Sequence, residues 1–379
     1  MRTRSIQVLT FVILAFSMTE TAAAQYLYNV TVLGTANSGL SSAAKINRWG
    51  QIAGQGANGH AMLWTPTADY GTTGHLNDLQ TAAGFPAGTQ SSWASALNDR
   101  GQVAGGAYTP GHGDGNQTQS WMWRPKTLNS STGALHGDMG KAVTFPLVTI
   151  PGYGNLSEHP SGINNHGVIV GSGIYYHALL WTPIVNNGKN GTWTYEPTYC
   201  SRTSGINDAG QIIGGTCEGQ YNLPFLHTGP FPLQGSDLIT SPLWVQPPSY
   251  DTIGYATGIN RAGHLAITAV DAAGTQLRAY LYKNGKAIDI SGSQTSNTSG
   301  INNHNQVIGQ ISGNTSLAAI YQGRKPTDLN TISAPLSHGS YQLKSAIDIN
   351  DAGEIICTGN YDDSNGYYGS GTFLLTLAH

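Results

Sequence analysis

Short hydrophobic runs alternate with turns rich in Asn, Gly and Ser along almost the whole chain. The recurring unit is an apolar residue, Asn, two variable residues, Gly, and a further apolar residue or Gln. Asn at the start of a turn can hydrogen-bond its own backbone two residues on, and Gly adopts the positive φ that closes a hairpin. We therefore expect a tight hairpin between two strands at each copy. The copies are Ile46–Gly50, Leu97–Gly101, Ile163–Gly167, Ile206–Gly210, Ile259–Gly263, Ile301–Asn305 and Ile349–Gly353.

The sixth copy ends in Asn305, and Asn is the residue that next most readily enters the left-handed region. A third strand is predicted after each hairpin, and a more variable fourth strand after most of them. The third strands are Ala61–Trp64, Trp121–Trp123, Ala178–Trp181, Pro224–Leu226, Ala279–Tyr282, Ala318–Tyr321 and Phe373–Leu375. Examples of the fourth are His75–Leu79, Phe145–Ile150, Ala287–Ile290 and Thr327–Leu329. Successive repeat Asn residues lie between 42 and 66 residues apart, which brackets the length of a four-stranded propeller blade.

The last unit has no fourth strand, because the chain stops at His379. The segment Tyr26–Leu33 precedes the first repeat and has the pattern of a fourth strand. We therefore expect an all-β fold, a seven-bladed β-propeller with four-stranded blades, in which the N-terminal strand completes the last blade. This topology places Val30–Val32 alongside Phe373–Leu375 and leaves few free sheet edges. The alternative is an open β-solenoid, which would leave the split final unit unexplained.

The N-terminal segment has the pattern of an export signal. Arg2 and Arg4 precede the apolar run Val8–Phe16, and Ala22–Ala24 is typical of a signal-peptidase site. We expect residues 1–24 to be a signal peptide, cleaved before Gln25, and residues 25–379 to form one propeller domain. An N-terminal anchor helix is the alternative, although the apolar run is about half of the roughly 20 residues that span a bilayer. We expect an extracellular or periplasmic protein of bacterial type, with no membrane insertion.

The composition agrees with a β-rich repeat protein and excludes some partners. Charged residues make up 10% of the chain and the net charge is −3, so no nucleic-acid footprint is expected. Glycine is abundant, with 50 residues, but follows no three-residue period, which excludes a collagen-like chain.

The Ile-Asn-x-x-Gly-Gln hairpins are paired with runs such as His60–Trp64 and His177–Trp181, which read His-Ala-Met-Leu-Trp and His-Ala-Leu-Leu-Trp. In this pairing the mature chain resembles the HAF-repeat family of probable extracellular bacterial proteins. The resemblance implies export and a repeat fold. It transfers no catalytic residue, because the family carries no settled activity.

Three cysteines fit an exported protein. If Asn207–Gly210 is the hairpin loop, Ile206 faces Gln211, and Cys200 faces Cys217 further out on the same two strands. Directly opposed residues bring their Cβ atoms close enough for a bridge after small adjustment. We predict a disulfide between Cys200 and Cys217 under oxidising conditions, and a buried, inert thiol at Cys357.

No standard catalytic, phosphate-binding or metal-binding motif occurs, so we expect no cofactor and no metal site. Asp362–Gly366 has part of a calcium-loop pattern, but Tyr361 stands at the first-ligand position. Histidines that recur at equivalent repeat positions, such as His60 and His177, are interpreted as structural hydrogen-bonding groups. Departures from the repeat concentrate in four segments where function is expected. They are Gly105–Gln119 with His112 and Asp114, Asn129–Lys141, Ser241–Gly254, and Gly359–Gly371.

The position five residues before each repeat Asn is predicted to lie at the mouth of the central channel. Around the ring it is occupied by Ser42, Trp93, His159, Arg202, Tyr255, Asn297 and Ser345. Four adjacent blades thus contribute Trp93, His159, Arg202 and Tyr255, with Glu158 beside His159, while three contribute small polar groups. Aromatic faces stack on sugar rings and Arg binds carboxylates with two hydrogen bonds. The plain alternative is that these side chains fill the channel or pack between blades.

Three functions are compatible with this pattern. The first is a secreted, non-catalytic binding module with a glycan or a partner protein at the channel mouth. The second is a polysaccharide-active enzyme, a lyase or a glycoside hydrolase. In a lyase His159 or Tyr255 would act as base, Arg202 as neutraliser of a uronate carboxylate, and Glu158 as an alternative acid or base. The third is a structural component of the cell envelope.

Overall fold

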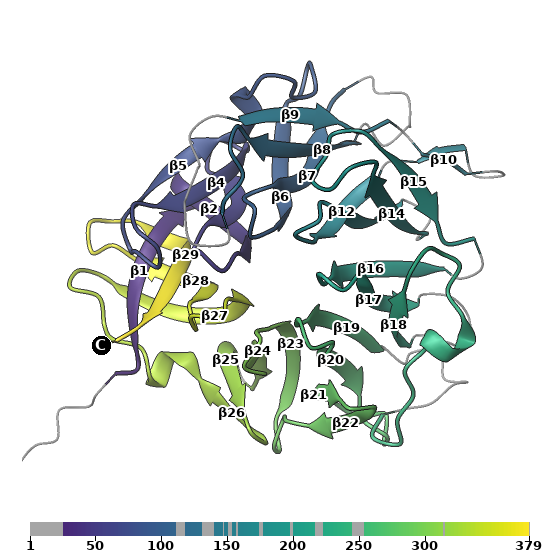
Figure 1. Ribbon diagram of the computed structural model, residues 1–379. Helices are drawn as coiled ribbons and strands as arrows, with labels where there is room; N and C mark the ends of the chain where they lie inside the picture. Colours follow the sequence, from purple (N-terminus) through teal and green to yellow (C-terminus); the bar gives the residue numbers. More distant parts are fainter. Residues whose placement is uncertain are drawn as a thin grey trace, which may run out of the picture.

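A computed structural model describes residues 26–110, 118–130, 140–146, 148–150, 154–156, 158–173, 177–197, 200–216, 223–244, 254–313 and 315–378. Within these ranges the protein is all-β, with antiparallel sheets, most of them four-stranded, arranged as the blades of a β-propeller around a central channel (Figure 1). The predicted signal peptide lies outside the described residues.

Each sheet is a run of consecutive strands, starting from the channel. One sheet holds β6 (Ser91–Leu97), β7 (Val103–Tyr108), β8 (Thr118–Pro125) and β9 (Gly140–Thr144). The next holds β12 (Glu158–Ile163), β13 (Ile169–Gly173), β14 (Ala178–Pro183) and β15 (Gly191–Tyr195). It is followed by β16 (Ser201–Ile206), β17 (Gln211–Thr216) and β18 (Pro224–Thr228). Then come β19 (Gly254–Ile259), β20 (Leu265–Val270), β21 (Leu277–Lys283) and β22 (Lys286–Asp289). The last of this group holds β23 (Thr295–Ile301), β24 (Val307–Ser312), β25 (Ser316–Gln322) and β26 (Lys325–Asp328).

The remaining blade strands form one continuous eight-stranded sheet in which the two ends of the chain meet. Its order is β27 (Ser340–Ile349), β28 (Ile355–Asp362), β29 (Tyr368–Leu377), β1 (Tyr28–Thr35), β2 (Ser38–Ile46), β3 (Ile52–Gly56), β4 (Ala61–Pro66) and β5 (Gly74–Asp78). Short 3-10 turns follow at Leu79–Thr81, Gly235–Asp237 and Leu329–Thr331, and a small separate ladder pairs β10 (Val148–Ile150) with β11 (Gly154–Leu156).

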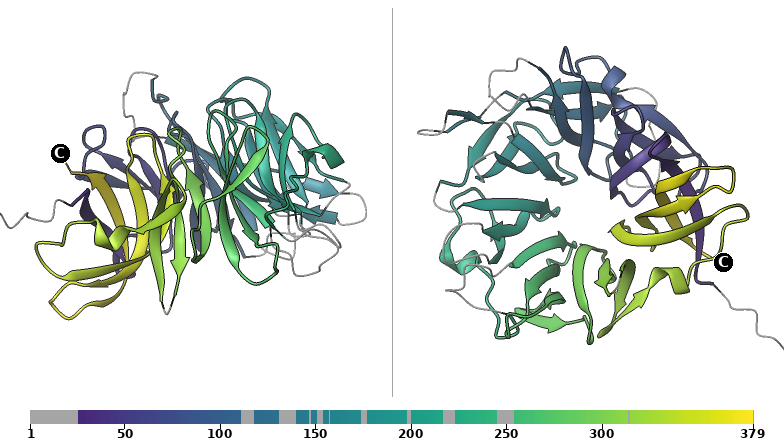
Figure 2. Two further views of the ribbon diagram at one scale, coloured as in Figure 1. Left: turned by 90° about the horizontal axis from the view of Figure 1, so that it is seen from below. Right: turned by 180° about the vertical axis from the view of Figure 1, so that it is seen from behind.

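The predicted pairing of the first and last strands is confirmed. β1 runs antiparallel to β29, with Val30 opposite Leu375 and Val32 opposite Phe373. Figure 2 shows the purple first strand lying against the yellow C-terminal strands, at the point where the ring closes. The blade that begins with β27 therefore takes its outermost strand from the opposite end of the sequence.

A tight hairpin is confirmed at each copy of the repeat. The glycine of each copy has a φ between 77° and 81°, and Asn305 has a φ of 61°. In the first six copies the Asn side-chain oxygen accepts the N–H two residues on, as Asn47 does from Trp49 at 3.1 Å. In all seven it also accepts the N–H four residues on, so each turn spans five residues.

Because of this longer turn, the predicted facing of Ile206 and Gln211 is wrong. Ile206 is opposite Ile212, and the strand β16 carries a bulge between Thr203 and Gly205. The bulge shifts the pairing back by one residue, so Ser201 is opposite Thr216. The inner strands that lead into the Asn turns all have a register shift at the equivalent position. They are β2, β6, β12, β16, β19, β23 and β27.

All predicted third strands are present, and the fourth strands at His75–Leu79, Ala287–Ile290 and Thr327–Leu329 coincide with β5, β22 and β26. The prediction for Phe145–Ile150 is wrong. The fourth strand of that blade is β9, which pairs with β8, and Phe145 is instead buried against Trp181 with ring centroids 4.7 Å apart. An apolar run cannot by itself distinguish a strand from a packing anchor.

The hydrophobic core lies between neighbouring sheets. Ala96, Ala104 and Met122 of the β6–β9 sheet pack against Ile163 and Trp181 of the next one, and the same kind of two-sheet cluster recurs around the ring. Trp64, Trp123 and Trp181 share one position on the third strand and are all buried. Burying a large aromatic side chain contributes about 2–3 kcal/mol, so neighbouring blades depend on each other for stability.

Candidate functional site

The repeat asparagines form a closed ring of hydrogen bonds around the channel. The Nδ2 group of each Asn donates to the main-chain oxygen of the next repeat Asn, at distances between 2.8 and 3.2 Å. The series runs through Asn47, Asn98, Asn164, Asn207, Asn260, Asn302 and Asn350, and returns from Asn350 to Asn47. All seven side chains are buried, so each one closes its own turn and fixes the neighbouring blade.

Two cavities lie along the channel, one on each side of the aliphatic residues that precede the ring asparagines. The cavity on the turn side has a volume of about 180 Å³ and the other about 170 Å³. In the second cavity the inner strands lie close together, because most of them carry Gly or Ala, with little or no side chain, two residues before the repeat Asn. A Cβ at Gly162 would lie 3.0 Å from the Cα of Gly205, so the strands approach too closely there for a side chain.

The two exceptions in this narrow section are Lys45 and Asp348, which meet at the closure of the ring. The Lys45 ammonium lies 3.8 Å from an Asp348 carboxylate oxygen, and the other oxygen accepts the Ile46 N–H at 3.0 Å. Burial nevertheless raises the pKa of the Asp348 carboxyl above its usual range. The pair joins β2 to β27 at the seam.

The channel has two mouths, which we name by the inner strands. The strand-start mouth is the end at which the inner strands begin, and it carries the predicted rim residues Trp93, His159, Arg202 and Tyr255. The turn-end mouth is the end at which the Asn turns lie. Because the rim residues come five residues before each Asn, the rim residues and the Asn turns lie toward opposite ends of the same strands.

The structure brings Trp93 and His159 together. Their rings are stacked, with centroids 6.3 Å apart and an interplanar angle of 17°. The Trp93 ring lies across Gly106, its partner on β7, where a Cβ would come within 2.3 Å of the indole. Trp93 therefore fills the space between its blade and the blade that carries His159, and both side chains are partly buried.

Arg202 and Tyr255 are more exposed. Arg202 is opposite Gly215 on β17, and Tyr255 of the next blade packs over Gly215, with its Cβ 3.0 Å from the position of a Cβ there. Tyr255 is 38% exposed, and Arg202 is exposed as well. The four residues thus lie on four consecutive inner strands, β6, β12, β16 and β19, as an uninterrupted half of the strand-start rim.

The other half of the rim is small and polar, as expected from Ser42, Asn297 and Ser345. Asn297 donates to Gln310 of its own blade at 3.3 Å, and Gln310 in turn donates to the Lys344 oxygen of the next blade. The Glu158 side chain, like His112, Asp114 and Tyr250, lies outside the described residues. The lyase assignment that pairs Glu158 with His159 therefore stays a prediction.

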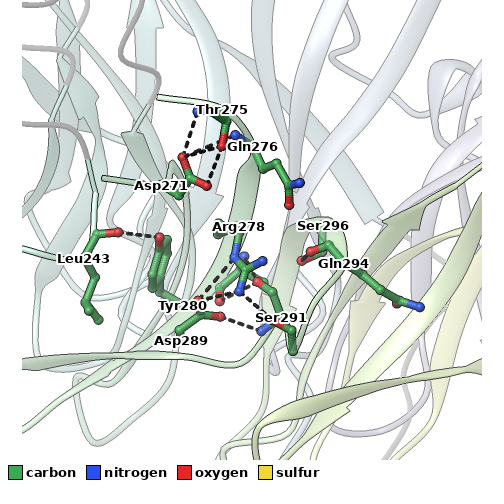
Figure 3. A network of polar contacts seen from close by, with 12 residues as sticks. Leu243, Asp271, Thr275, Gln276, Arg278, Tyr280, Asp289, Ser291, Gln294 and Ser296 are labelled. Atoms are coloured by element: carbon green, nitrogen blue, oxygen red, sulfur yellow. Dashed lines mark hydrogen bonds and ion pairs between the residues drawn. The ribbon is translucent and has the colours of Figure 1, made fainter. Parts of the chain in front are cut away.

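Recurrent histidines have the structural role predicted for them. His60 Nδ1 lies 2.7 Å from Asp78 at the end of the fourth strand, and His177 Nδ1 lies 2.8 Å from the main-chain oxygen of Glu196. At the equivalent position on β21, Arg278 forms an ion pair with Asp289 at 2.7 Å (Figure 3). Each of these side chains links the start of a third strand to the end of the fourth strand or to the residue directly after it.

The cysteine predictions are only partly tested. Ser201 is opposite Thr216 at the outer end of the described pairing, and Cys217 lies outside the described residues. The disulfide stays a prediction. Cys357 is fully buried on β28, and burial raises the pKa of its thiol well above the usual range. This agrees with the predicted inert thiol, because the thiolate is the reactive form.

The segment Gly359–Gly371 is a long hairpin. β28 and β29 remain paired as far as Asp362 and Tyr368, and Asp363 caps the turn by accepting the N–H groups of Asn365 and Tyr367. Asp362 accepts the Ser364 N–H, which is typical of a polar turn. Among the described residues, no group of three or more His, Cys, Asp or Glu side chains is arranged to hold a metal ion. Within the same ranges, no helix is long and apolar enough to span a bilayer.

Sequence reasoning missed the turn-end mouth. The residue after each repeat Asn is one of the two variable residues of the turn. At all seven copies this residue lines the inner cavity, and five of them, Arg48, Asp99, Asn165, Asp208 and Arg261, also line a wider outer chamber of about 470 Å³. The signal was present in the sequence, because this position holds Arg48, Asp99, Asn165, Asp208, Arg261, Asn303 and Asp351. These charged and polar side chains can be interpreted as parts of one site only when the turns are known to converge on the channel.

Comparisons with known proteins add little to this description. No family model matches the sequence, and no curated protein is similar to it at a significant level. Similar solved structures include the acylaminoacyl peptidase of Pyrococcus horikoshii, with a TM-score of 0.48, 10% identity, and coverage of 92% of this chain and 51% of that chain. TolB from Acinetobacter baumannii has a TM-score of 0.36, 11% identity, and coverage of 87% and 79%.

A third similar structure is YCF48 bound to D1 peptide, with a TM-score of 0.33, 9% identity, and coverage of 93% of this chain and 95% of that chain. The present chain spans about half the length of the acylaminoacyl peptidase. At these identities and TM-scores, the likeness assigns no function to this chain.

Proposed function

We propose that the chain is a secreted, seven-bladed β-propeller of the HAF-repeat type that acts as a non-catalytic binding module. Its ligand, a partner protein or a glycan, would dock at the strand-start mouth on the rim formed by Trp93, His159, Arg202 and Tyr255. The observation that carries this proposal is the uninterrupted half-rim of large side chains on four consecutive inner strands, of which Arg202 and Tyr255 are exposed.

The chemistry of the half-rim favours recognition over catalysis. Trp, Tyr and Arg are the residues that contribute most to binding at protein interfaces, and aromatic faces also stack on sugars. A catalytic base needs a free, oriented side chain within hydrogen-bond reach of the substrate. The His159 ring is instead stacked on Trp93, an arrangement that suits a rigid platform.

The test compares the purified mature chain with a rim variant. Arg202→Ala combined with Tyr255→Ala removes the two exposed rim side chains, and Arg324→Ala combined with Tyr368→Ala removes two exposed side chains elsewhere. We expect a ligand found on a panel of peptides and neutral or acidic glycans to bind the rim variant at least about tenfold more weakly, a loss of about 1.4 kcal/mol. The control variant should bind as the wild type does.

Two results would overturn the proposal. One is a ligand whose affinity for the rim variant and for the wild type is equal. The other is the appearance of an unsaturated product, seen by its absorbance, when the wild type is incubated with uronate polymers. That product would favour the lyase, in which Arg202 and Tyr255 would act on substrate.

A further inference from the structure

A second ladder of hydrogen bonds lies one residue beyond the asparagine ring. At this position the main-chain N–H of one blade donates to the side-chain oxygen at the same position of the next blade. The pairs are Arg48 to Asp99 at 3.0 Å, Asp99 to Asn165 at 2.8 Å, Asn165 to Asp208 at 2.8 Å, Arg261 to Asn303 at 2.8 Å and Asn303 to Asp351 at 2.9 Å.

This second ladder is broken twice, in both cases where the next blade carries Arg. Asp208 is followed around the ring by Arg261, and Asp351 is followed by Arg48. A guanidinium has only donors, so it cannot accept the preceding N–H. Among the described residues, the main-chain N–H groups of Asp208 and Asp351 therefore have no acceptor, and both residues line the inner cavity.

The acidic side chains around this mouth already have donors. Asn165 Nδ2 donates to Asp99 at 3.0 Å and to Asp208 at 2.8 Å, and Asn303 Nδ2 donates to Asp351 at 2.7 Å. With the ladder bonds, every carboxylate oxygen of Asp99, Asp208 and Asp351 accepts at least one hydrogen bond. The unpaired groups of the second ladder are therefore donors, which a ligand must meet with acceptors. Beside the outer chamber, the buried Asn187 Oδ1 has no hydrogen-bond partner among the described residues, and a ligand hydroxyl would supply its donor.

Three guanidinium groups surround the outer chamber at the same mouth. Arg48 lies over the Trp49 ring, 4.3 Å from its centroid, and Arg100 donates to the Asn129 main-chain oxygen at 3.1 Å. Arg261 is exposed and makes no side-chain hydrogen bond to the described residues. None of the three has a described carboxylate within 4.0 Å, whereas Arg278 on the outer part of its blade pairs with Asp289 (Figure 3).

We propose that the turn-end mouth is a binding site for a small carboxylate ligand of about monosaccharide size. A carboxylate offers two acceptors in one plane, which matches the fork of a guanidinium, and its second oxygen can accept an unpaired main-chain N–H. The outer chamber, at about 470 Å³, has the volume of an ordinary small-molecule site. The site lies at the opposite end of the channel from the proposed rim and stands independently of it.

The first experiment measures binding of D-galacturonate and of D-galactose to the wild-type protein by calorimetry. The two sugars share ring size and differ in the carboxylate. We expect galacturonate to bind at least about tenfold more tightly than galactose, and its affinity to fall as salt is raised, because exposed charge pairs are screened. Equal affinities for the two sugars, or no saturable binding of galacturonate up to about 10 mM, would overturn the proposal.

Arg261→Asn separates ligand binding from folding. Asn fits the ladder at this position, as Asn165 and Asn303 do, and would give the Asp208 N–H the acceptor that it lacks. We expect this variant to keep or raise the melting temperature and to lose at least about tenfold in galacturonate affinity. Arg48→Asn repeats the test at the second break, and Arg324→Asn, which removes a charge on the exposed turn after β25, is the matched control.

The outcomes of the variants are decisive in either direction. Wild-type affinity in both Arg261→Asn and Arg48→Asn contradicts the site, and so does an equal loss in Arg324→Asn. A rim variant with Arg202→Ala and Tyr255→Ala should bind galacturonate as the wild type does, so failure of the rim proposal leaves this result unchanged.

Discussion

At the scale of single residues, the repeat is best understood from its variants. Four residues after each Asn most copies carry Gln, whose side-chain oxygen accepts from that Asn, as Gln51 does from Asn47 at 2.8 Å. Where His264 occupies this position, Asn305 of the next blade supplies the acceptor instead, and its Oδ1 lies 3.0 Å from Asn260 Nδ2. Asn305 thus does more than tolerate its positive φ. The last copy carries Glu354, which accepts from Asn350 at 2.5 Å but whose buried Oε1 has no hydrogen-bond partner among the described residues.

Replacing Glu354 with Gln should stabilise the protein and change its pH dependence. Burial raises the pKa of the Glu354 carboxyl above its ordinary value of 4.5, so the folded state holds the proton more tightly than the unfolded state does. The stabilisation from this group is complete below pH 4.5 and is lost as pH rises through the raised pKa of the folded state. At pH 7 we expect Glu354→Gln to raise the free energy of unfolding by about 1 kcal/mol or more.

The measurement is chemical denaturation of wild type and variant between pH 4 and pH 8. The difference between the two curves should be near zero at the acidic end and should grow with pH. Asp348, which has the same direction of shift, is present in both proteins and cancels. Two parallel curves would show that Glu354 remains charged at no cost in the folded protein.

At the scale of elements, β1 is the strand on which closure of the ring depends. Tyr28 is buried in the same cluster as Phe373 and Leu375, and β1 also continues directly into the hairpin with β2. Without β1, the long strand β29 would present an open edge with apolar side chains, which favours aggregation.

Deleting Tyr26–Val32 should therefore destabilise the protein by about 3 kcal/mol or more, the loss expected for removal of a buried aromatic anchor. Thermal unfolding and size-exclusion chromatography measure the effect. A synthetic peptide with the sequence of residues 26–35 should restore much of the melting temperature, whereas the same composition in scrambled order should not. An unchanged melting temperature after the deletion would mean that closure does not depend on the strand.

The elements also show what the sequence can and cannot predict. The hairpins, the third strands and the pairing of β1 follow from local patterns, because Asn, Gly and the apolar runs act within a few residues. The bulge at Ser204 is different, because it is set by contact with the next blade, where the Ser204 hydroxyl donates to the Ala256 oxygen. The five-residue turn and the bulge offset each other, which is why Ser201 faces Thr216, as the predicted shorter loop also requires, while Ile206 faces Ile212 and not Gln211.

The candidate sites show the same limit. The identities of the rim residues could be predicted, because the position of a residue within the repeat gives its position on the ring. The contacts between Trp93 and His159, or between Tyr255 and Gly215, depend on the angle between blades, which the sequence does not encode locally. The turn-end mouth was missed because Arg48 and Arg261 look like ordinary turn residues until their neighbours across the channel are known.

At the scale of the whole molecule, stability should depend on where the chain is cut. Two circular permutants test this, both with residue 378 joined to residue 26 by a short linker. One opens the exposed turn at Asn284–Gly285 within a sheet, and the other opens the exposed connection at Gly292–Ser293 between two sheets. In the first, β22 would still pair with β21 and hold the new ends together, as β1 and β29 do in the natural chain.

We expect the permutant cut within the sheet to melt close to the natural protein. The permutant cut between sheets should melt at least about 5 °C lower, because its ends belong to different blades and no strand pairing joins them. Differential scanning calorimetry measures both. Equal melting temperatures would show that the asparagine ring and the packing between blades close the molecule without help from a shared sheet.

The pairing of Tyr28 with Leu377 also decides how the molecule responds to tension. The two strands run in opposite directions, so a pull on both ends of the chain is applied at the same edge of the ladder. Hydrogen bonds then rupture one after another, as in a zipper, and the load is never shared along the strand. A domain tethered through both termini would therefore yield at this junction under weak force, while the remaining blades still hold their shape.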